Sequence, residues 1–434
     1  MLPCIEELAG QPYSKSVERL SRKIRQRLQG NMRELSLPRR FPVTATELES
    51  WQRLEAAWKS LAQAQGAWLI DAGDGVEANL AIEGLYCLRQ ILLLRGLSHR
   101  PVPEGLWLDV HWIYTATLEA GSARQQVRRS FLRHHSRTTI EWEYIHTIWL
   151  ALSDPFSLTA NELLALDSLL EKWVPMMNLY ADGQTGWTIH EKTDVPAQWE
   201  AGKEGMRLDF SQFFAFLESR QDLVSRLGRF EWDEHPDDTL PARLLEHWES
   251  LWEHHAWDGL AGVEGQQTAV EIGLSKLFGR LQGEPSSGAV MTATANQWWR
   301  LEEASGVRVG DLVGLFDGND DSLTRLAVVA KLSQETGDDT RVWLQLVELQ
   351  GQVLPAGVQP LYAGERPLTY QRGLLLQQEK RLILLVAQQR LEDGTVVRLL
   401  CGEKVFPVRL SQRDNIARNL LAFACESVAR EFQK

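Results

Sequence analysis

The periodicity of the sequence changes once, near Gly265, and this change constrains the fold more than any other feature. Before it, apolar residues recur in steps of three and four, which is the spacing of helices with one packed face. After it, β-branched residues and short alternating runs are separated by turns rich in Gly, Asp and Asn. We therefore predict an α+β protein, with a mostly helical domain over residues 1–262 and a β-domain over residues 263–434.

The helical region carries start signals for individual helices. Thr159 stands three residues before Glu162, and Thr44 or Thr46 precedes an acidic first turn, so both places favour a capping box. Trp residues recur at helical spacing, which is typical of the core between packed helices. The polar segment near residues 183–207 contains Gly and Pro, so we expect a loop or short strands that could divide this domain into two subdomains.

The segment Ser16–Leu28 predicts a helix with a basic outer surface. A solvated face beside a narrow packed stripe is the favoured interpretation, and docking to an acidic partner or a membrane surface is the alternative. The residues of the apolar stripe are Val17, Leu20, Ile24 and Leu28. The cations around it are Arg19, Arg22, Lys23, Arg25 and Arg27.

Short strands at regular spacing after Gly265 predict a small antiparallel barrel. The stretches FDGNDDS and ETGDDT are typical of hairpin turns. The helical spacing of the final apolar residues predicts a C-terminal helix over Arg413–Glu431. The candidate strands are Val290–Thr294, Asp311–Phe316, Leu323–Leu332, Arg341–Leu349, Leu382–Ala387, Thr395–Leu400 and Lys404–Leu410.

Charge and hydropathy exclude several classes of protein. The formal net charge of −12 and the pI of about 5.4 argue against generic binding along a nucleic-acid backbone, because phosphates attract a positive face. No apolar run approaches the ~20 residues that a membrane span needs. The N-terminus lacks the basic and apolar segments of a signal peptide. We expect a cytoplasmic protein without a transmembrane segment.

The sequence shows no complete motif of a catalytic or metal-binding site. It contains no G-x-S-x-G, no P-loop and no G-x-G-x-x-G after a strand. Glu143 and His146 form a single E-x-x-H, whereas carboxylate di-metal sites use two such motifs and further Glu residues. The four cysteines are scattered, with no C-x-x-C pair. We therefore predict no enzymatic activity, no metal site and no cofactor.

The β-region resembles a PilZ domain, the small barrel with which bacteria bind cyclic di-GMP. The resemblance rests on WWRLEEASGVRVGDLVGL at 298–315 and on the strand–turn–strand segment at 323–349. The segments at 366–376 and 403–410 are similar to the extended tail of larger proteins, in which a helical N-terminal region precedes a divergent PilZ domain. Segments 86–114 and 149–166 resemble that N-terminal region, so the resemblance covers most of the chain.

The binding signature of the PilZ family is replaced in this sequence. The family has Arg-x-x-x-Arg and then Asp/Asn-x-Ser-x-x-Gly, whereas Ala293–Trp298 stands at the second motif here. The spacing of the first motif is kept only by Lys276 and Arg280, and Lys is not equivalent to Arg. A rescued site is conceivable, in which Trp298 or Trp299 stacks a guanine and Arg300 or Arg308 holds a phosphate. The alternative is that one Trp is core and the other an interface anchor.

The resemblance implies a signalling or adaptor protein of the PilZ type. In the favoured interpretation the chain acts without catalysis, through contacts with a protein partner, and its binding of cyclic di-GMP is degenerate or lost. In the alternative it is a cyclic di-GMP receptor with a non-standard site around Lys276–Arg308. The candidate ligand-binding residues are Lys276, Arg280, Trp298, Trp299, Arg300 and Arg308.

Overall fold

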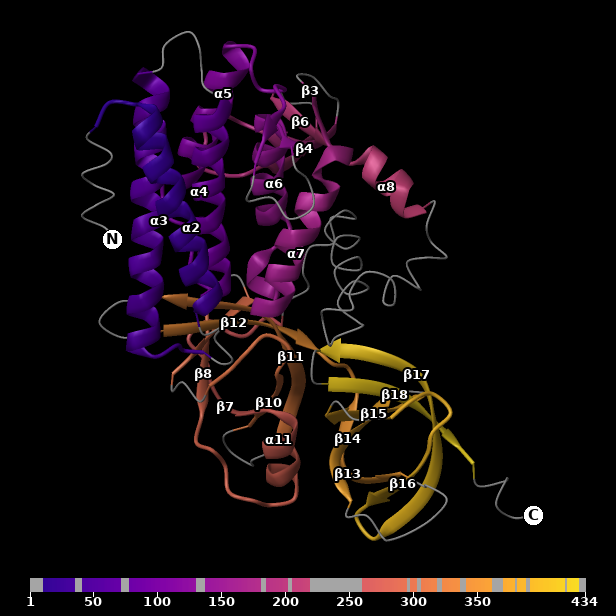
Figure 1. Cartoon of the computed structure of the whole chain (residues 1–434). Coiled ribbons are helices and arrows are strands. Elements are labelled where there is room, and N and C mark those ends of the chain that lie inside the picture. Colours follow the sequence, from indigo (N-terminus) through magenta and orange to yellow (C-terminus); the bar gives the residue numbers. More distant parts are fainter. Residues whose placement is uncertain are drawn as a thin grey trace. The chain divides into compact units, whose positions relative to one another are not determined.

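A computed structural model describes most of the 434 residues of the chain (Figure 1). The described residues are 11–35, 41–71, 78–129, 137–180, 185–201, 205–218, 260–294, 297–302, 306–317, 322–335, 341–360, 370–378, 381–387, 391–417 and 420–428. The chain divides into two compact units. Unit 1 comprises Met1–Pro38 and Val43–His255, and unit 2 comprises Arg39–Pro42 and Ala256–Lys434. The α+β class is confirmed, because unit 1 is mainly helical and unit 2 mainly strands.

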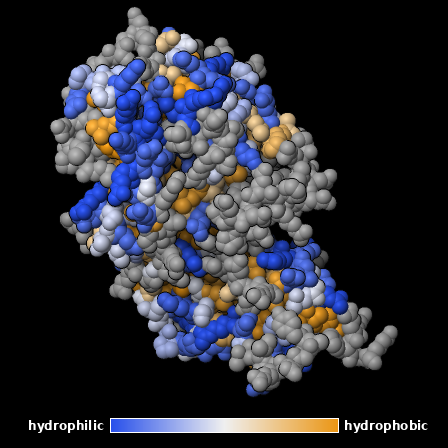
Figure 2. All heavy atoms as spheres, viewed as in Figure 1, coloured by the Kyte–Doolittle hydropathy of each residue, from blue (hydrophilic) through white to orange (hydrophobic). Residues whose placement is uncertain are grey.

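Unit 1 is built around one central helix. Along α4 nearly every side chain is buried, the mark of a helix that is surrounded on all sides. α3, α5, α6 and α7 all pack against it, and α2 packs against α3. Figure 2 shows mostly hydrophilic side chains over the visible face of α2 and α3. The helices are α2 (Lys15–Glu34), α3 (Ala45–Asp71), α4 (Ala78–Leu97), α5 (Leu106–Glu119), α6 (Ile140–Leu152), α7 (Ala160–Trp173) and α8 (Ser211–Glu218), with 3-10 turns at Pro155–Ser157 and Val174–Met176.

Both predicted capping boxes are present. Thr159 and Glu162 satisfy each other's orphan backbone N–H groups at the start of α7. At the start of α3 the cap is Thr44, whose Oγ accepts from the Glu47 N–H at 3.3 Å while its own N–H donates to the Glu47 carboxylate at 2.8 Å.

The predicted packing stripe of α2 needs two corrections. Leu20 is 46% exposed, and the buried face instead contains Ser21, which accepts from Gln65 at 2.7 Å. Arg25 is buried rather than solvated, and its guanidinium lies 2.9 Å from the Glu83 carboxylate. A pattern of residue types favours Leu inside and Arg outside, but here a buried ion pair and a hydrogen bond stabilise the opposite arrangement.

The segment near residues 183–207 contributes strands, one of the two predicted outcomes. A four-stranded sheet has the order β3-β6-β4-β5, and a separate two-stranded pair joins β1 to β2. The strands are β1 (Val127–Arg128), β2 (Arg137–Thr138), β3 (Asn178–Tyr180), β4 (Thr185–Ile189), β5 (Gln198–Ala201) and β6 (Met206–Asp209).

Unit 2 contains two closed antiparallel barrels where the sequence predicted one. All the candidate strands are present, and five strands that were not predicted (β7, β9, β13, β14 and β18) complete the two barrels. The first barrel is formed by β7 (Gln267–Ile272), β8 (Val290–Ala293), β9 (Trp298–Leu301), β10 (Leu312–Phe316), β11 (Leu323–Glu335) and β12 (Arg341–Glu348). The second is formed by β13 (Gln352–Pro360), β14 (Gln371–Gln378), β15 (Arg381–Ala387), β16 (Val396–Cys401), β17 (Lys404–Ala417) and β18 (Leu420–Ser427).

The two barrels have the same strand order. In each, numbering the strands from one to six along the chain gives the order one-two-three-six-five-four, closed by a pair between strands four and one. The sequence shows no repeat, because an alternating apolar pattern and suitable turns specify such a barrel without requiring the same residues. Unit 2 is therefore a tandem of one topology, with the helix α11 (Leu274–Leu281) inserted after the first strand of the first barrel.

The predicted C-terminal helix is wrong, because Arg413–Glu431 contributes the end of β17 and all of β18. Leu421 and Phe423 of β18 face the core of the second barrel, whereas Leu420 and Ala422 face a cluster that also includes Leu277 of α11. A strand that is buried on both faces has a continuous apolar run, and residue spacing alone cannot distinguish that run from a buried helix.

Candidate functional site

A cavity of 720 Å³ lies in unit 2, between the first barrel and the second. The first barrel contributes the beginning of α11 and the turn that leads into β10, and the second contributes residues of β14, β15 and β18. Gly273 places α11 here: its φ of 98° suits a residue without Cβ, and its N–H donates to Leu312 O at 2.7 Å. The volume is within the usual range of small-molecule sites.

Three cationic side chains line this cavity: Lys276, Arg308 and Arg372. Lys276 is exposed and forms no hydrogen bond or ion pair with the described part of the chain. Arg308 donates from Nε to the buried Asp311 carboxylate at 2.9 Å, while a third of its side chain stays exposed. The cavity wall thus carries one ammonium that no described carboxylate neutralises, beside a guanidinium held in place by a carboxylate.

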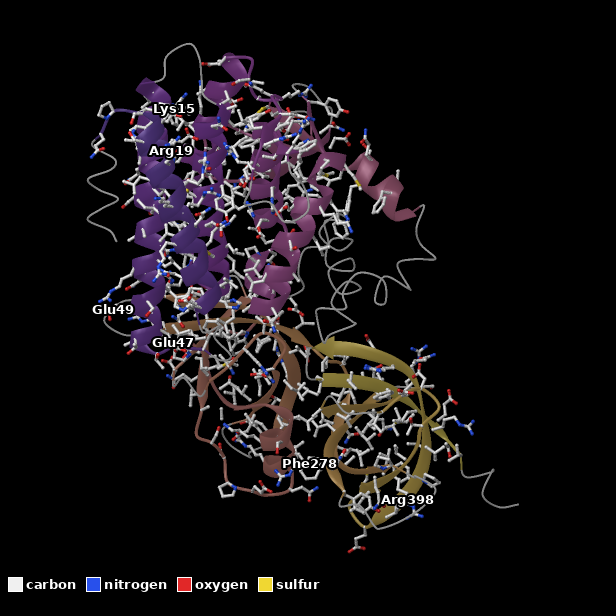
Figure 3. All side chains as sticks on the ribbon, in the orientation of Figure 1. Lys15, Arg19, Glu47, Glu49, Phe278 and Arg398 are labelled. Atoms are coloured by element: carbon white, nitrogen blue, oxygen red, sulfur yellow. The ribbon has the colours of Figure 1, made fainter. Side chains whose placement is uncertain are left out.

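Arg372 reaches the cavity from the second barrel and contacts α11. Its guanidinium donates to Ser275 O at 2.9 Å and to the Glu284 carboxylate at 2.9 Å. It also lies over the ring of Phe278, with 5.3 Å from Cζ to the ring centroid; Figure 3 labels Phe278 on this helix. Sequence reasoning did not identify this residue, because it lies outside Lys276–Arg308, the segment around which the site was predicted.

Arg280, which was predicted to bind ligand, points into protein rather than into the cavity. It is buried, its guanidinium carbon lies 3.7 Å from the centroid of the Phe316 ring, and its guanidinium lies 3.6 Å from the Glu271 carboxylate. These contacts fix α11 against the barrel wall. The spacing shared by Lys276 and Arg280 therefore does not bring both cations to one site.

The predicted aromatic residues lie on another wall of the first barrel. β9 is three strands away from β10 in both directions around the barrel. Trp299 is core, 3% exposed, and donates from its indole N–H to Leu260 O at 2.8 Å. Trp298 and Arg300 alternate with the buried residues and face outward. Arg300 pairs with Glu302 at 2.7 Å, and hydrogen bonds from Thr292 and Arg300 hold the pKa of Glu302 below its usual value.

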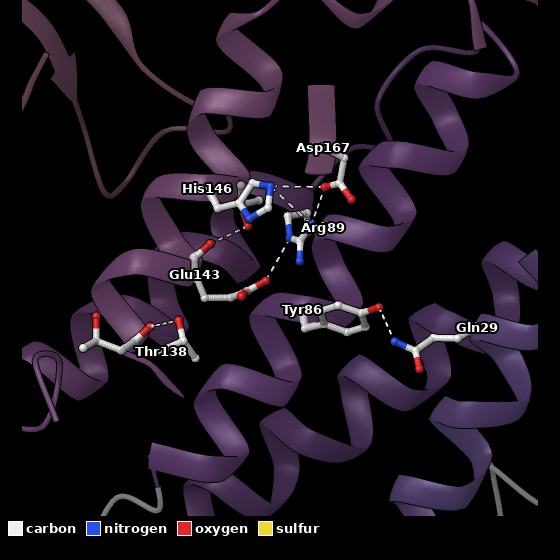
Figure 4. Close-up of polar contacts among 9 residues, drawn as sticks. Gln29, Tyr86, Arg89, Thr138, Glu143, His146 and Asp167 are labelled. Atoms are coloured by element: carbon white, nitrogen blue, oxygen red, sulfur yellow. Dashed lines mark hydrogen bonds and ion pairs between the residues drawn. The ribbon is translucent and has the colours of Figure 1, made fainter. Parts of the chain in front are cut away.

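A second polar cluster, in the core of unit 1, contains the E-x-x-H motif (Figure 4). Arg89 donates from Nε to Glu143 at 2.8 Å, and its NH1 also contacts Asp167. His146 Nε2 lies 3.2 Å from Asp167 and 3.3 Å from Arg89 NH1. The side chains of Arg89, Glu143 and His146 are each 2% exposed. This network therefore joins α4, α6 and α7 inside the core and is not accessible to a ligand.

Among the described residues, no group of three or more His, Cys, Asp or Glu side chains is arranged to hold a metal ion. Of the described helices, none combines the length and the apolar character that crossing a membrane requires.

Comparison with known proteins gives one family match, in the helical region, and one match to a whole protein. Residues 7–182 match the family described as the N-terminal domain of the cyclic-di-GMP receptor FimW. The cyclic-di-GMP receptor FimW of Pseudomonas aeruginosa is 29% identical over 79 residues, which cover 18% of this chain and 13% of that protein. The alignment thus spans only a small part of the length of FimW. No solved structure matches the chain. Residues 7–182 are therefore similar to the N-terminal domain of that receptor family, and these matches support the prediction of a relation to cyclic di-GMP receptors.

Proposed function

We propose that this chain is a receptor for cyclic di-GMP and that it binds the dinucleotide in the cavity lined by Lys276, Arg308 and Arg372. The observation that carries the proposal is the convergence of these three cations, from two barrels, on one cavity of 720 Å³. The two matches to a cyclic-di-GMP receptor support the choice of ligand. The PilZ signature is replaced in this sequence, so the site is a non-standard one.

The cations suit the two chemical features of the ligand. Cyclic di-GMP carries two phosphodiester anions and two flat guanines. A guanidinium offers a fork of N–H donors to a phosphate and a flat face to a purine, whereas an ammonium acts as a point charge. Arg308 and Arg372 are already held by Asp311 and Glu284, so their side chains lose little further freedom on binding. Lys276 supplies the charge that no described carboxylate neutralises.

We further propose that the chain transmits this binding without catalysis, to a protein partner. We infer that residues 263–434 bind the ligand and that the helical residues 1–262 bind the partner. The family that residues 7–182 match is described as a receptor domain. This description supports a role in binding for the chain rather than a role in catalysis.

Calorimetric titration of the full chain with cyclic di-GMP tests the proposal, with GTP and cyclic di-AMP as selectivity controls. We expect saturable binding of cyclic di-GMP. Lys276→Ala and Arg308→Ala should each weaken it by about tenfold or more, the usual consequence of losing a charge-assisted contact. Arg300→Ala is the matched control, because that side chain lies on the outer face of β9 and should leave the affinity unchanged.

Other outcomes separate the alternatives. Loss of binding in Arg300→Ala but not in Lys276→Ala would move the site to β9 and its Trp298. An absence of saturable binding would contradict the receptor proposal, and it would leave the barrels as a scaffold for an adaptor that works through protein contacts alone.

A further inference from the structure

The outer face of α2 carries five cations along its length, which we call the basic stripe: Lys15, Arg19, Arg22, Lys23 and Arg27. All five side chains are exposed. Lys15, Arg19, Lys23 and Arg27 follow one another in steps of four residues, so they span about 18 Å along the helix axis. Figure 3 shows Lys15 and Arg19 following each other along α2.

The charge of the stripe is largely uncompensated. Within the described residues only Arg22 has an ion-pair partner, Glu18, at 2.8 Å on the same helix. Lys15, Arg19, Lys23 and Arg27 have no ion pair or hydrogen bond with the described residues. The chain as a whole carries a net charge of −12, so this stripe is a local reversal of sign.

The helix that carries the stripe is fixed by its opposite face. Val17 and Leu28 are buried in the core of unit 1, and Ser21 accepts a hydrogen bond from Gln65. Buried Arg25 pairs with Glu83. The cations are therefore presented on a preformed helix, and binding through them requires no folding step.

We propose that the basic stripe docks unit 1 on a membrane surface rich in anionic phospholipids. The cations occupy an arc of about 140° around the helix, and long Lys and Arg side chains can extend from such an arc to one plane of mobile headgroups. Protein interfaces instead depend on buried apolar or aromatic anchors. Among the described residues of α2, Leu20 is the large apolar side chain that is exposed, at 46%, so the helix offers little for such an anchor.

Vesicle co-sedimentation of the full chain tests this proposal. We expect binding to vesicles of phosphatidylcholine mixed with phosphatidylglycerol, weaker binding at high salt, and no binding to pure phosphatidylcholine. Because each surface cation contributes about fivefold to such binding, the double variant Arg19→Glu/Lys23→Glu should lower the partition constant at least about twentyfold. Arg19→Lys/Lys23→Arg keeps the charge and should bind like the unaltered chain.

The second barrel offers a matched control pair, Arg398 and Lys404, which are also exposed cations. Arg398→Glu/Lys404→Glu makes the same change of net charge and should leave vesicle binding intact. If the anionic vesicles do not bind the chain, or if both charge-reversed pairs lose binding equally, the proposal is overturned. Retention of an acidic protein or of RNA through the stripe, without vesicle binding, would equally reject the lipid assignment. Titration with cyclic di-GMP is independent of these outcomes.

Discussion

At the scale of single residues, Arg89 shows how unit 1 tolerates charge inside its core. Its guanidinium is surrounded by Glu143, Asp167 and His146, and it lies 5.1 Å from the centroid of the Tyr86 ring. Burial raises the pKa of the Tyr86 phenol, so this neighbour stays neutral. The stability of the cluster depends on each charge having its partner, because an isolated buried charge is costly.

Replacing Arg89 with Met should therefore lower the free energy of unfolding by about 3–5 kcal/mol, because Glu143 and Asp167 would be left without their counter-charge. Arg53→Met is the control: Arg53 pairs with Glu49 on the surface, is 71% exposed, and its loss should have no measurable effect. Urea unfolding followed by circular dichroism compares the two. Equal stability of the two variants would contradict a structural role for the Arg89 network.

We expect His111 to make the stability of unit 1 depend on pH. It is fully buried, with Nε2 2.8 Å from Val195 O and Nδ1 2.7 Å from the Tyr144 hydroxyl. A carbonyl only accepts, so Nε2 carries the proton and Nδ1 accepts from Tyr144. Burial lowers the pKa of His111 below its ordinary value of 6.5. As the pH falls through that value, the unfolded chain binds this proton first, and the native state loses stability.

The contribution of His111 to the free energy of unfolding should hence be fully present above pH 6.5 and decline below it. The His111→Gln variant should show a shallower decline over the same range. Urea titrations of both proteins on either side of this pH measure the difference in slope. Parallel pH profiles for the two would show that His111 is not the residue responsible.

At the scale of elements, α11 is the part of unit 2 that positions the candidate site. Its Leu277 is fully buried and packs over Gly314 of β10, where an added Cβ would lie 2.3 Å from a Leu277 methyl carbon. The β10 backbone is paired on both sides and Leu277 is fully buried, so either would have to shift against packed neighbours. The close approach of the helix to the barrel thus depends on a residue without a side chain.

Gly314→Val should therefore destabilise unit 2 by about 1–3 kcal/mol through overpacking. Because α11 carries Lys276, it should also weaken binding of cyclic di-GMP. Gly30→Ala on α2, where an added Cβ meets nothing within 4 Å, is the control and should be neutral or slightly stabilising. Thermal melts and the titration described above measure both effects. Unchanged affinity in a destabilised Gly314→Val protein would mean that the position of α11 does not matter to the site.

These elements also show where prediction from sequence succeeds. The helix starts at Thr44 or Thr46 and at Thr159 were predicted, and the structure has them at Thr44 and Thr159, because a cap is a local interaction among neighbouring residues. β18 was mistaken for a helix because its two faces are buried in different clusters, which only the tertiary structure reveals. The cavity combines predicted Lys276 and Arg308 with Arg372, which no local pattern could have identified. Arg280 and Trp299 have suitable chemistry, but packing directs them into protein.

At the scale of the whole molecule, the two barrels of unit 2 are joined by a shared apolar cluster around α11. Leu277 of the first barrel's helix shares an apolar cluster with Leu374 and Leu420 of the second barrel. The candidate site is built in the same way, since Lys276 and Arg308 belong to one barrel and Arg372 to the other. A ligand held by all three cations would therefore bridge the barrels and stabilise unit 2 as a whole, while unit 1 has its own separate core.

Differential scanning calorimetry should then resolve an effect confined to one of the two units. At a cyclic di-GMP concentration one hundred times Kd, binding to the native state adds about 2.7 kcal/mol of stability. We expect the transition that Gly314→Val lowers to move to higher temperature, and the transition that Arg89→Met lowers to stay in place. Arg372→Ala should reduce the shift, because the second barrel would lose its contact with the ligand. A ligand-induced shift of the Arg89-sensitive transition instead would place the site in unit 1, since only binding to the native form of a unit can stabilise that unit.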